Sequence, residues 1–143
     1  MSFSGEYEGT LDKQNRVKLP AQFKAALGNT FVITGLKTWG FVTLRTPLAF
    51  DQMMARLEAN ASPLDPVFMH VLPQLGASSF EVTTDDRGRF TVPPKLQSYV
   101  SPSVIFVGAG ETVRVHKAAA WRTDSKQAEM ALKLLAERLA GGG

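Results

Sequence analysis

Two nine-residue stretches of this chain, residues 12–20 and residues 85–93, carry the same pattern of charged and apolar side chains. Each begins with an aspartate, has an arginine four positions later, continues as a short run of alternating apolar and polar residues, and ends with a proline. An acid and a base at this spacing can form an ion pair across a turn. An arginine held in this way is suited to bidentate contact with a phosphate or the edge of a guanine. The two pairs are Asp12 with Arg16 and Asp85 with Arg89.

The residue before each arginine permits a tight turn. Gly88 can take a positive φ without strain. Asn15 holds the equivalent position in the first stretch, and asparagine is one of the few residues tolerated in the left-handed region. Both turns can therefore adopt the same backbone. The flanking apolar residues alternate, so Phe80 and Val82 before the second turn and Phe90 and Val92 after it are expected to share one face of a hairpin. In the alternative interpretation each ion pair only closes its hairpin, but an exposed ion pair contributes only about 0–1 kcal/mol, a weak reason to repeat it.

Basic side chains gather around both stretches, although the net charge of the whole chain is only +3. Lys13, Lys18 and Lys24 belong to or follow the first stretch, and Arg87 and Lys95 the second. Attraction to phosphate acts within a Debye length of about 8–10 Å, so this local concentration matters more than the total charge. A repeated basic turn is predicted to contact a repetitive polyanion at two points.

The correspondence between the two stretches extends along the chain. Residue 12 corresponds to residue 85 and residue 20 to residue 93; at the same offset residues 31–35 correspond to residues 104–108, and both of these runs end in glycine. Farther on the offset drifts by a residue or two. This pattern predicts an internal duplication. Each half is expected to form a strand, the turn, a second strand, a short helix begun by proline, two more strands and a longer helix.

The longer helix of the second half is predicted from near Ala118 to about Leu139, and its first-half counterpart from Pro47 to Leu57. In the helix that begins near Ala118, mostly apolar positions recur at steps of four and three residues, a seam that can pack on another helix. The positions are Trp121, Ser125, Ala128, Leu132, Leu135 and Leu139. Packing within the same chain and contact between subunits both remain open. Residues 62–66 are predicted to form a turn that leads into the link between the halves.

Composition favours a small folded protein of the cytoplasm. The chain has 143 residues, 44% of them apolar and none of them cysteine, so it is expected to form one domain or two small ones that share a core. Disulfides and thiolate metal sites are excluded. No apolar run approaches the roughly 18 residues that span a bilayer, and residues 1–6 lack the features of a signal peptide, so no membrane association is expected.

Catalytic and cofactor signals are weak. His70 and His116 are the only histidines and have no second ligand at metal spacing; His70 lies in an apolar helical run and is predicted to be structural. Residues 108–111 lack the lysine and hydroxyl residue of a phosphate loop and are predicted to form a hairpin turn. No cofactor, metal or enzyme activity is expected.

The residues around both turns resemble the signatures of one family, MraZ. The opening of that family is similar to Phe3-x-Gly5-x-Tyr7-x-x-Thr10-Leu11-Asp12-x-x-x-Arg16-Val17-x-Leu19-Pro20. Its second signature is similar to Asp85-x-x-Gly88-Arg89-Phe90-x-Val92-Pro93, followed by Val107-Gly108-x-Gly110 and Trp121. The resemblance covers nearly the whole chain, with both copies in order. Asn15 departs from it, because the family usually has glycine there.

The resemblance implies an α+β fold of two tandem swapped-hairpin, AbrB-like repeats that form one compact, pseudo-twofold, β-barrel-like unit with peripheral helices. The repeats would be residues 1–61 and residues 62–143, the second including the C-terminal helix. It further implies a nucleoid-associated, sequence-specific transcriptional regulator, expected to be a repressor, that binds repeated promoter elements of the division and cell-wall gene cluster as a ring-like homo-oligomer.

The expected contacts with double-stranded DNA follow from the same resemblance. The family's acid–arginine signature carries over onto two pairs, in which each aspartate orients its arginine, and three further basic residues add attraction to phosphate. The complete predicted set is Asp12, Lys13, Arg16, Lys18, Asp85, Arg87 and Arg89.

Other functions remain open from the residues alone. The basic turns could face acidic protein partners in an oligomeric scaffold, which would lack the steep salt dependence of DNA binding. A barrel-like enzyme would need a pocket that holds Asp12 or Asp85 away from solvent. RNA is a lesser alternative, because neither turn offers an aromatic stacking platform.

Overall fold

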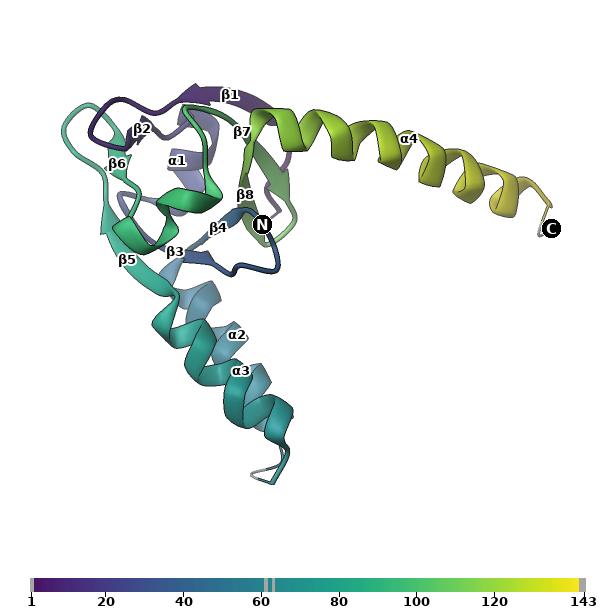
Figure 1. Ribbon diagram of the computed structural model, residues 1–143, viewed down its shortest axis with the longest axis horizontal. Helices are drawn as coiled ribbons and strands as arrows, with labels where there is room; N and C mark the ends of the chain where they lie inside the picture. Colours follow the sequence, from purple (N-terminus) through teal and green to yellow (C-terminus); the bar gives the residue numbers. More distant parts are fainter. Residues whose placement is uncertain (1, 61, 63, 142–143) are drawn as a thin grey trace.

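The protein has an α+β fold, as predicted, in which three helices project from a body of strands (Figure 1). The computed structural model describes residues 2–60, 62 and 64–141. The first half contains β1 (Glu6–Thr10), β2 (Arg16–Lys18), α1 (Ala21–Leu27), β3 (Thr30–Gly35), β4 (Val42–Arg45) and α2 (Pro47–Ala59). The second half contains α3 (Pro66–Ala77), β5 (Ser79–Thr83), β6 (Arg89–Thr91), the 3-10 helix η1 (Pro94–Tyr99), β7 (Ser103–Ala109), β8 (Thr112–Lys117) and α4 (Ala118–Gly141).

The order of these elements follows the predicted order in each half, and α3, which has no counterpart in the first half, contains the helical run predicted around His70. The turn predicted over residues 62–66 and the proposed boundary at residue 61 fall partly on residues 61 and 63, which lie outside the described residues.

The strands form two antiparallel sheets. The larger sheet has six strands in the order β1-β7-β8-β4-β3-β5, and the smaller one, the ribbon, consists of β2 and β6. Within the described residues the larger sheet ends at β1 and β5 without a pairing between them, so the β-barrel-like unit implied by the resemblance is not a closed barrel. After each of these edge strands the chain turns and enters the ribbon.

Each strand of the first half pairs with a strand of the second half: β1 with β7, β2 with β6, β3 with β5, and β4 with β8. The registers correspond. Glu6 lies opposite Val107, and the residues that correspond to them at the offset of 73, Ser79 and Thr34, also lie opposite one another.

The two strands around each acid–arginine turn do not pair with one another as arms of a local hairpin. Phe80 and Val82 before the second turn, and Phe90 and Val92 after it, pack on the same core, as their alternation predicts. Their strands, however, belong to different sheets, because β5 pairs with β3 and β6 pairs with β2. The prediction of a local hairpin was wrong in this respect, since alternation determines which face of a strand is buried and not which strand is its partner.

The core lies between the larger sheet and the ribbon and is rich in phenylalanine. Phe23, Phe31, Phe90 and Phe106 are fully buried. The ring of Phe90 meets that of Phe31 edge to face at 5.3 Å and that of Phe106 at 6.4 Å. Such contacts add to the stability gained from burying the rings themselves. Phe90 therefore anchors the ribbon to the larger sheet.

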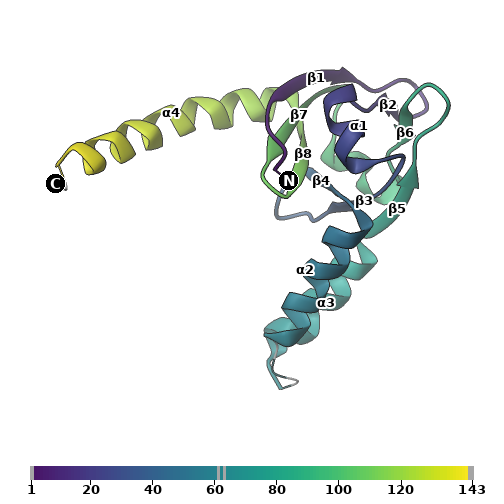
Figure 2. The same cartoon turned by 180° about the vertical axis from the view of Figure 1, so that it is seen from behind.

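The helices that project from the body are α2, α3 and α4 (Figures 1 and 2). Helix α2 has Pro47 at its start and is capped by Thr46, whose hydroxyl accepts the peptide N–H of Ala49 at 3.1 Å. Helix α3 lies beside α2. None of the described helices is both long and apolar enough to cross a membrane.

Helix α4 begins at Ala118, as predicted, but most of it does not pack on the body. Trp121 at its start is half-buried and donates a hydrogen bond from Nε1 to Glu6. Leu132, Leu135 and Leu139 are 63%, 50% and 75% exposed. Of the two alternatives left open for the seam, packing of its whole length within the same chain is excluded, and its outer part is an unpartnered apolar surface in the described chain.

Replacement of a leucine inside the core should be far more costly than replacement of one on the surface. Leu44 is fully buried in β4, so Leu44→Ala should lower the free energy of unfolding by about 2–5 kcal/mol through lost burial and a cavity. Leu48 at the start of α2 is 67% exposed and serves as the matched control. Leu48→Ala should change the free energy of unfolding by about 0.5 kcal/mol or less. Urea denaturation measures both, and equal effects would contradict this account of the core.

Candidate nucleic-acid interface

The first turn is closed by one carboxylate that accepts three hydrogen bonds. Oδ1 of Asp12 accepts the peptide N–H groups of Gln14 and Arg16, each at 2.9 Å, and Oδ2 accepts Nε–H of Arg16 at 2.8 Å. The peptide N–H of Asp12 donates to the carbonyl of Arg16 at 2.9 Å. Asn15 takes a φ of 59°, the left-handed conformation that its position in the sequence predicts.

The second turn repeats this geometry atom for atom. Oδ1 of Asp85 accepts the peptide N–H groups of Arg87 and Arg89, each at 2.9 Å, and Oδ2 accepts Nε–H of Arg89 at 2.9 Å. Gly88 has a φ of 76°. The two turns therefore share one backbone conformation, as predicted from Gly88 and Asn15.

These hydrogen bonds also fix the charge of each turn. The peptide N–H of Arg16 lowers the pKa of the Asp12 carboxyl below its ordinary value, and the side chain of Arg16 acts in the same direction. Arg89 does the same for the pKa of Asp85, again mainly through its peptide N–H. Both carboxylates are thus ionised at neutral pH. Each binds its arginine through Nε alone, which leaves the two Nη groups of the guanidinium for another partner.

The ribbon places both arginines on one face. Arg16 lies opposite Thr91, and Lys18 lies opposite Arg89. Since alternate residues of a strand share a face, these four side chains point away from the core. Val17 and Phe90, between them in sequence, are buried. The arginine side chains remain 34% and 27% exposed despite their ion pairs.

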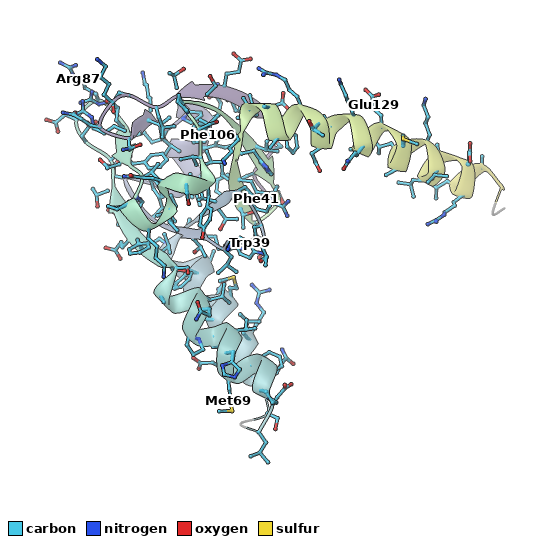
Figure 3. All side chains as sticks on the ribbon, viewed as in Figure 1. Trp39, Phe41, Met69, Arg87, Phe106 and Glu129 are labelled. Carbon is cyan, nitrogen blue, oxygen red and sulfur yellow. The ribbon has the colours of Figure 1, made fainter. Side chains whose placement is uncertain are left out.

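One backbone hydrogen bond ties each turn to the strand that follows the other turn. The peptide N–H of Leu19 donates to the carbonyl of Gly88, and that of Val92 donates to the carbonyl of Asn15, both at 2.9 Å. The turns consequently lie at opposite ends of one ribbon. The structure brings all seven predicted site residues into this ribbon and its turns, and Lys13 and Arg87 are exposed at the tips. Figure 3 labels Arg87 at the tip of the second turn.

Lys24 is a member of this surface that the sequence assigns to the wrong turn. It follows the first stretch in sequence, yet its Nζ lies 3.6 Å from the position that a Cβ on Gly88 would take. Thr91 and Gln14 were not predicted as site residues either. Thr91 corresponds to Lys18 and Gln14 corresponds to Arg87 in the other half, so the duplication could have indicated both as site residues.

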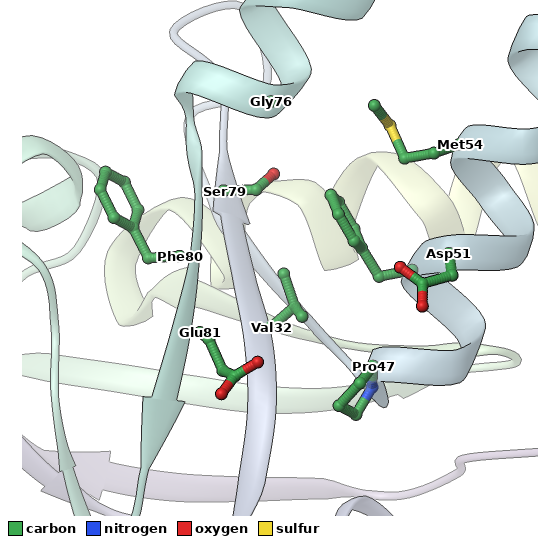
Figure 4. A pocket seen from close by; sticks show the side chains of 9 residues that line it. Val32, Pro47, Asp51, Met54, Gly76, Ser79, Phe80 and Glu81 are labelled. Atoms are coloured by element: carbon green, nitrogen blue, oxygen red, sulfur yellow. The ribbon is translucent and has the colours of Figure 1, made fainter.

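The cavity of about 330 Å³ between β3, β5, α2 and α3 is separate from this surface (Figure 4). Its lining includes the carboxylates of Asp51 and Glu81 together with apolar side chains such as Met54 and Phe80, and it includes no residue of either turn. Asp12 and Asp85 are exposed at the turns, which is the opposite of what a buried catalytic carboxylate requires.

The histidines lie away from the ribbon. His70 lies on α3, as the helical run predicts, but its side chain is exposed, so a structural role in packing is not supported. His116 on β8 is buried between the rings of Phe41 and Trp121, at centroid distances of 4.6 and 4.9 Å. Burial lowers the pKa of His116, and Arg114 acts in the same direction, so its imidazole is neutral at physiological pH.

Comparison with known proteins finds relatives that carry one name. The chain is 32% identical over 123 residues to the transcriptional regulator MraZ of Leuconostoc mesenteroides, and this alignment covers 83% of each chain. It is 30% identical over 129 residues to the protein of that name from Dictyoglomus thermophilum, covering 87% of this chain and 86% of the other. The protein of that name from Caldanaerobacter subterraneus is 29% identical over 139 residues, 94% of each chain. No family model matches the chain.

Substitutions at the left-handed position of the second turn should separate backbone strain from side-chain effects. A Cβ at Gly88 would meet only Lys24 Nζ at an ordinary contact distance, so the cost of Gly88→Ala lies in its φ of 76° and should be about 1 kcal/mol. Gly88→Asn should cost less, because Asn15 already occupies the equivalent conformation. Urea denaturation compares the two variants, and an equal loss would contradict the shared geometry of the turns.

Proposed function

The chain belongs to the MraZ family of transcriptional regulators, and from this premise we propose that it binds double-stranded DNA in a sequence-specific manner through the face of the β2–β6 ribbon. The observation that carries the proposal is the pair of matching acid–arginine turns on one exposed ribbon. In this function the protein represses the division and cell-wall gene cluster from repeated elements in its promoter.

The ribbon suits the major groove in size and chemistry. A major groove about 12 Å wide admits a two-stranded β-ribbon. Arg16 and Arg89 point outward from such a ribbon, and each is fixed by its aspartate through Nε. The remaining Nη groups can donate to O6 and N7 of a guanine or to a phosphate. Because the aspartate fixes the guanidinium before DNA binds, less side-chain entropy is lost on docking.

Attraction to phosphate comes from the basic residues that surround the two arginines. Lys13 and Arg87 are exposed at the tips, and Lys18 is exposed on the outer face of the ribbon. Attraction to phosphate acts within a Debye length of about 8–10 Å, so each of these charges acts on the part of the DNA backbone nearest to it. Their charge draws the ribbon to the DNA backbone, and the fixed arginines Arg16 and Arg89 read base edges.

We also propose that the unit is a pair of swapped-hairpin, AbrB-like repeats, residues 1–61 and residues 62–143, related by a pseudo-twofold axis. This arrangement is supported by the strand order, which reads the same from both ends when each strand is replaced by its counterpart in the other half. It is also supported by matching registers, since Arg16 opposite Thr91 becomes Arg89 opposite Lys18 at the offset of 73.

The exposed seam of α4 supports assembly into a ring-like homo-oligomer. Leu132, Leu135 and Leu139 form an apolar stripe on a helix that extends from the body, and burial of such a stripe against another copy would be favourable. Linking several ribbons raises the effective concentration of each near DNA, which favours binding to direct repeats. The protein would act in the cytoplasm, in association with the nucleoid.

A second candidate, an oligomeric interaction scaffold without specific DNA binding, is favoured only by that same stripe on α4. It gives no role to the matched turns. Ionic strength separates the two functions, because six to ten phosphate contacts would lower DNA affinity by about 10³–10⁵-fold between 50 and 200 mM salt.

Removal of either fixed arginine should weaken binding to the promoter while leaving the fold intact. Arg16→Ala and Arg89→Ala should each lose about 1–3 kcal/mol of affinity for the promoter repeats, the value of a good bidentate contact with a base. The melting temperature should stay nearly unchanged because each ion pair is exposed. Binding is measured by fluorescence anisotropy at near-physiological salt.

Arg122→Ala on α4 is the matched control, since it removes the same charge from an exposed site outside the ribbon. The control should bind like the parent protein. Wild-type affinity in both ribbon variants would contradict the assignment of this surface to DNA.

A further inference from the structure

The two turns carry different residues at three corresponding positions, Lys13 and Asp86, Gln14 and Arg87, and Asn15 and Gly88; the middle pair, Gln14 and Arg87, places two side chains of different chemistry at the tips. Both peptide N–H groups donate to Oδ1 of the aspartate two residues earlier at 2.9 Å. In both turns the following residue has a positive φ, 59° at Asn15 and 76° at Gly88. The two side chains therefore leave the chain from the same backbone geometry, at opposite ends of the ribbon.

Both side chains are available to a ligand. Gln14 and Arg87 are exposed, and among the described residues neither side chain has a hydrogen bond or an ion pair of its own. Arg16 and Arg89 are different, because they are identical in type and fixed by aspartates. The ribbon thus offers one matched pair of reading residues and one unmatched pair.

The chemistry of the unmatched pair predicts two different bases. A glutamine amide can donate to N7 and accept from the N6 amino group of adenine, whereas a guanidinium donates twice to O6 and N7 of guanine. We propose that Gln14 and Arg87 are specificity-determining residues, with Gln14 selecting adenine at one end of the ribbon and Arg87 selecting guanine at the other. This inference rests on the proposed function of the ribbon in the major groove.

The residues next to the tips reinforce the difference. Lys13 precedes Gln14, and its positive charge adds attraction to phosphate at the first tip. Asp86 precedes Arg87, and its negative charge weakens attraction to phosphate at the second tip. The second tip consequently depends more on its contact with a base. A ribbon that is nearly symmetric in backbone would therefore read an asymmetric site and bind each promoter repeat in one orientation.

The test is selection of bound sequences from a randomised pool of duplex DNA by the parent protein and three full-length variants. The parent should select an A·T pair at one position and a G·C pair at its symmetry-related position. Gln14→Arg should convert the first to G·C, and Arg87→Gln should convert the second to A·T. Each preference should be roughly 5- to 150-fold, the range for one bidentate contact.

The double variant Gln14→Arg/Arg87→Gln gives the sharpest outcome. The exchange moves each reading residue to the other end of the ribbon, so the protein should select the sequence of the parent in the reversed orientation. On duplex DNA this is the same site, and the altered preference of each single variant should therefore disappear in the double variant.

Gln52→Arg on α2 and Arg122→Gln on α4 are the matched controls, because both residues are exposed and distant in sequence from the turns. They should select the same sequences as the parent. Specific binding that persists in both single variants with unchanged base preferences would overturn this inference and leave the proposed function standing. Loss of all specific binding by both variants, with melting temperatures intact, would also overturn it. No specific selection by the parent protein would instead overturn the proposed function.

Discussion

The pairing of β2 with β6 is the interaction on which the rest of the structure depends. Each strand has only three residues, too few to persist alone, and each comes from a different half of the chain. Val17 and Phe90 on the inner face are buried, and Phe90 contacts the rings of Phe31 and Phe106 in the larger sheet. The same few residues thus close the core on one side and present a basic surface on the other.

The aspartate of each turn converts this ribbon into a defined surface. One carboxylate satisfies two peptide N–H groups and one guanidinium, so the backbone of the turn and the direction of the arginine are set together. An exposed ion pair adds little stability. Its repetition is better explained by preorganisation of the arginine for a ligand, and the free Nη groups of Arg16 and Arg89 provide the donors that such a ligand would meet.

Much of this surface was predictable from the sequence because its determinants are local. The spacing of Asp85 and Arg89, with Gly88 before the arginine, specifies a turn, and Asn15 specifies the same turn in the first half. Partners distant in the sequence were not predictable in this way. Alternation could not indicate that β6 pairs with β2, and no local pattern places Lys24 beside Gly88. The seam of α4 was ambiguous for a related reason, since an apolar stripe does not specify whether its partner lies in the same chain.

Methylation of guanine N7 by dimethyl sulfate, on a promoter fragment saturated with protein, reports both the bases that the ribbon contacts and the groove in which it lies. N7 lies in the major groove and is one of the two acceptors of an arginine contact. The wild-type protein should protect specific guanines in each repeat, and Arg16→Ala and Arg89→Ala should each expose a different subset at equal occupancy. Unchanged methylation on fully bound DNA would show that the ribbon does not read the major groove.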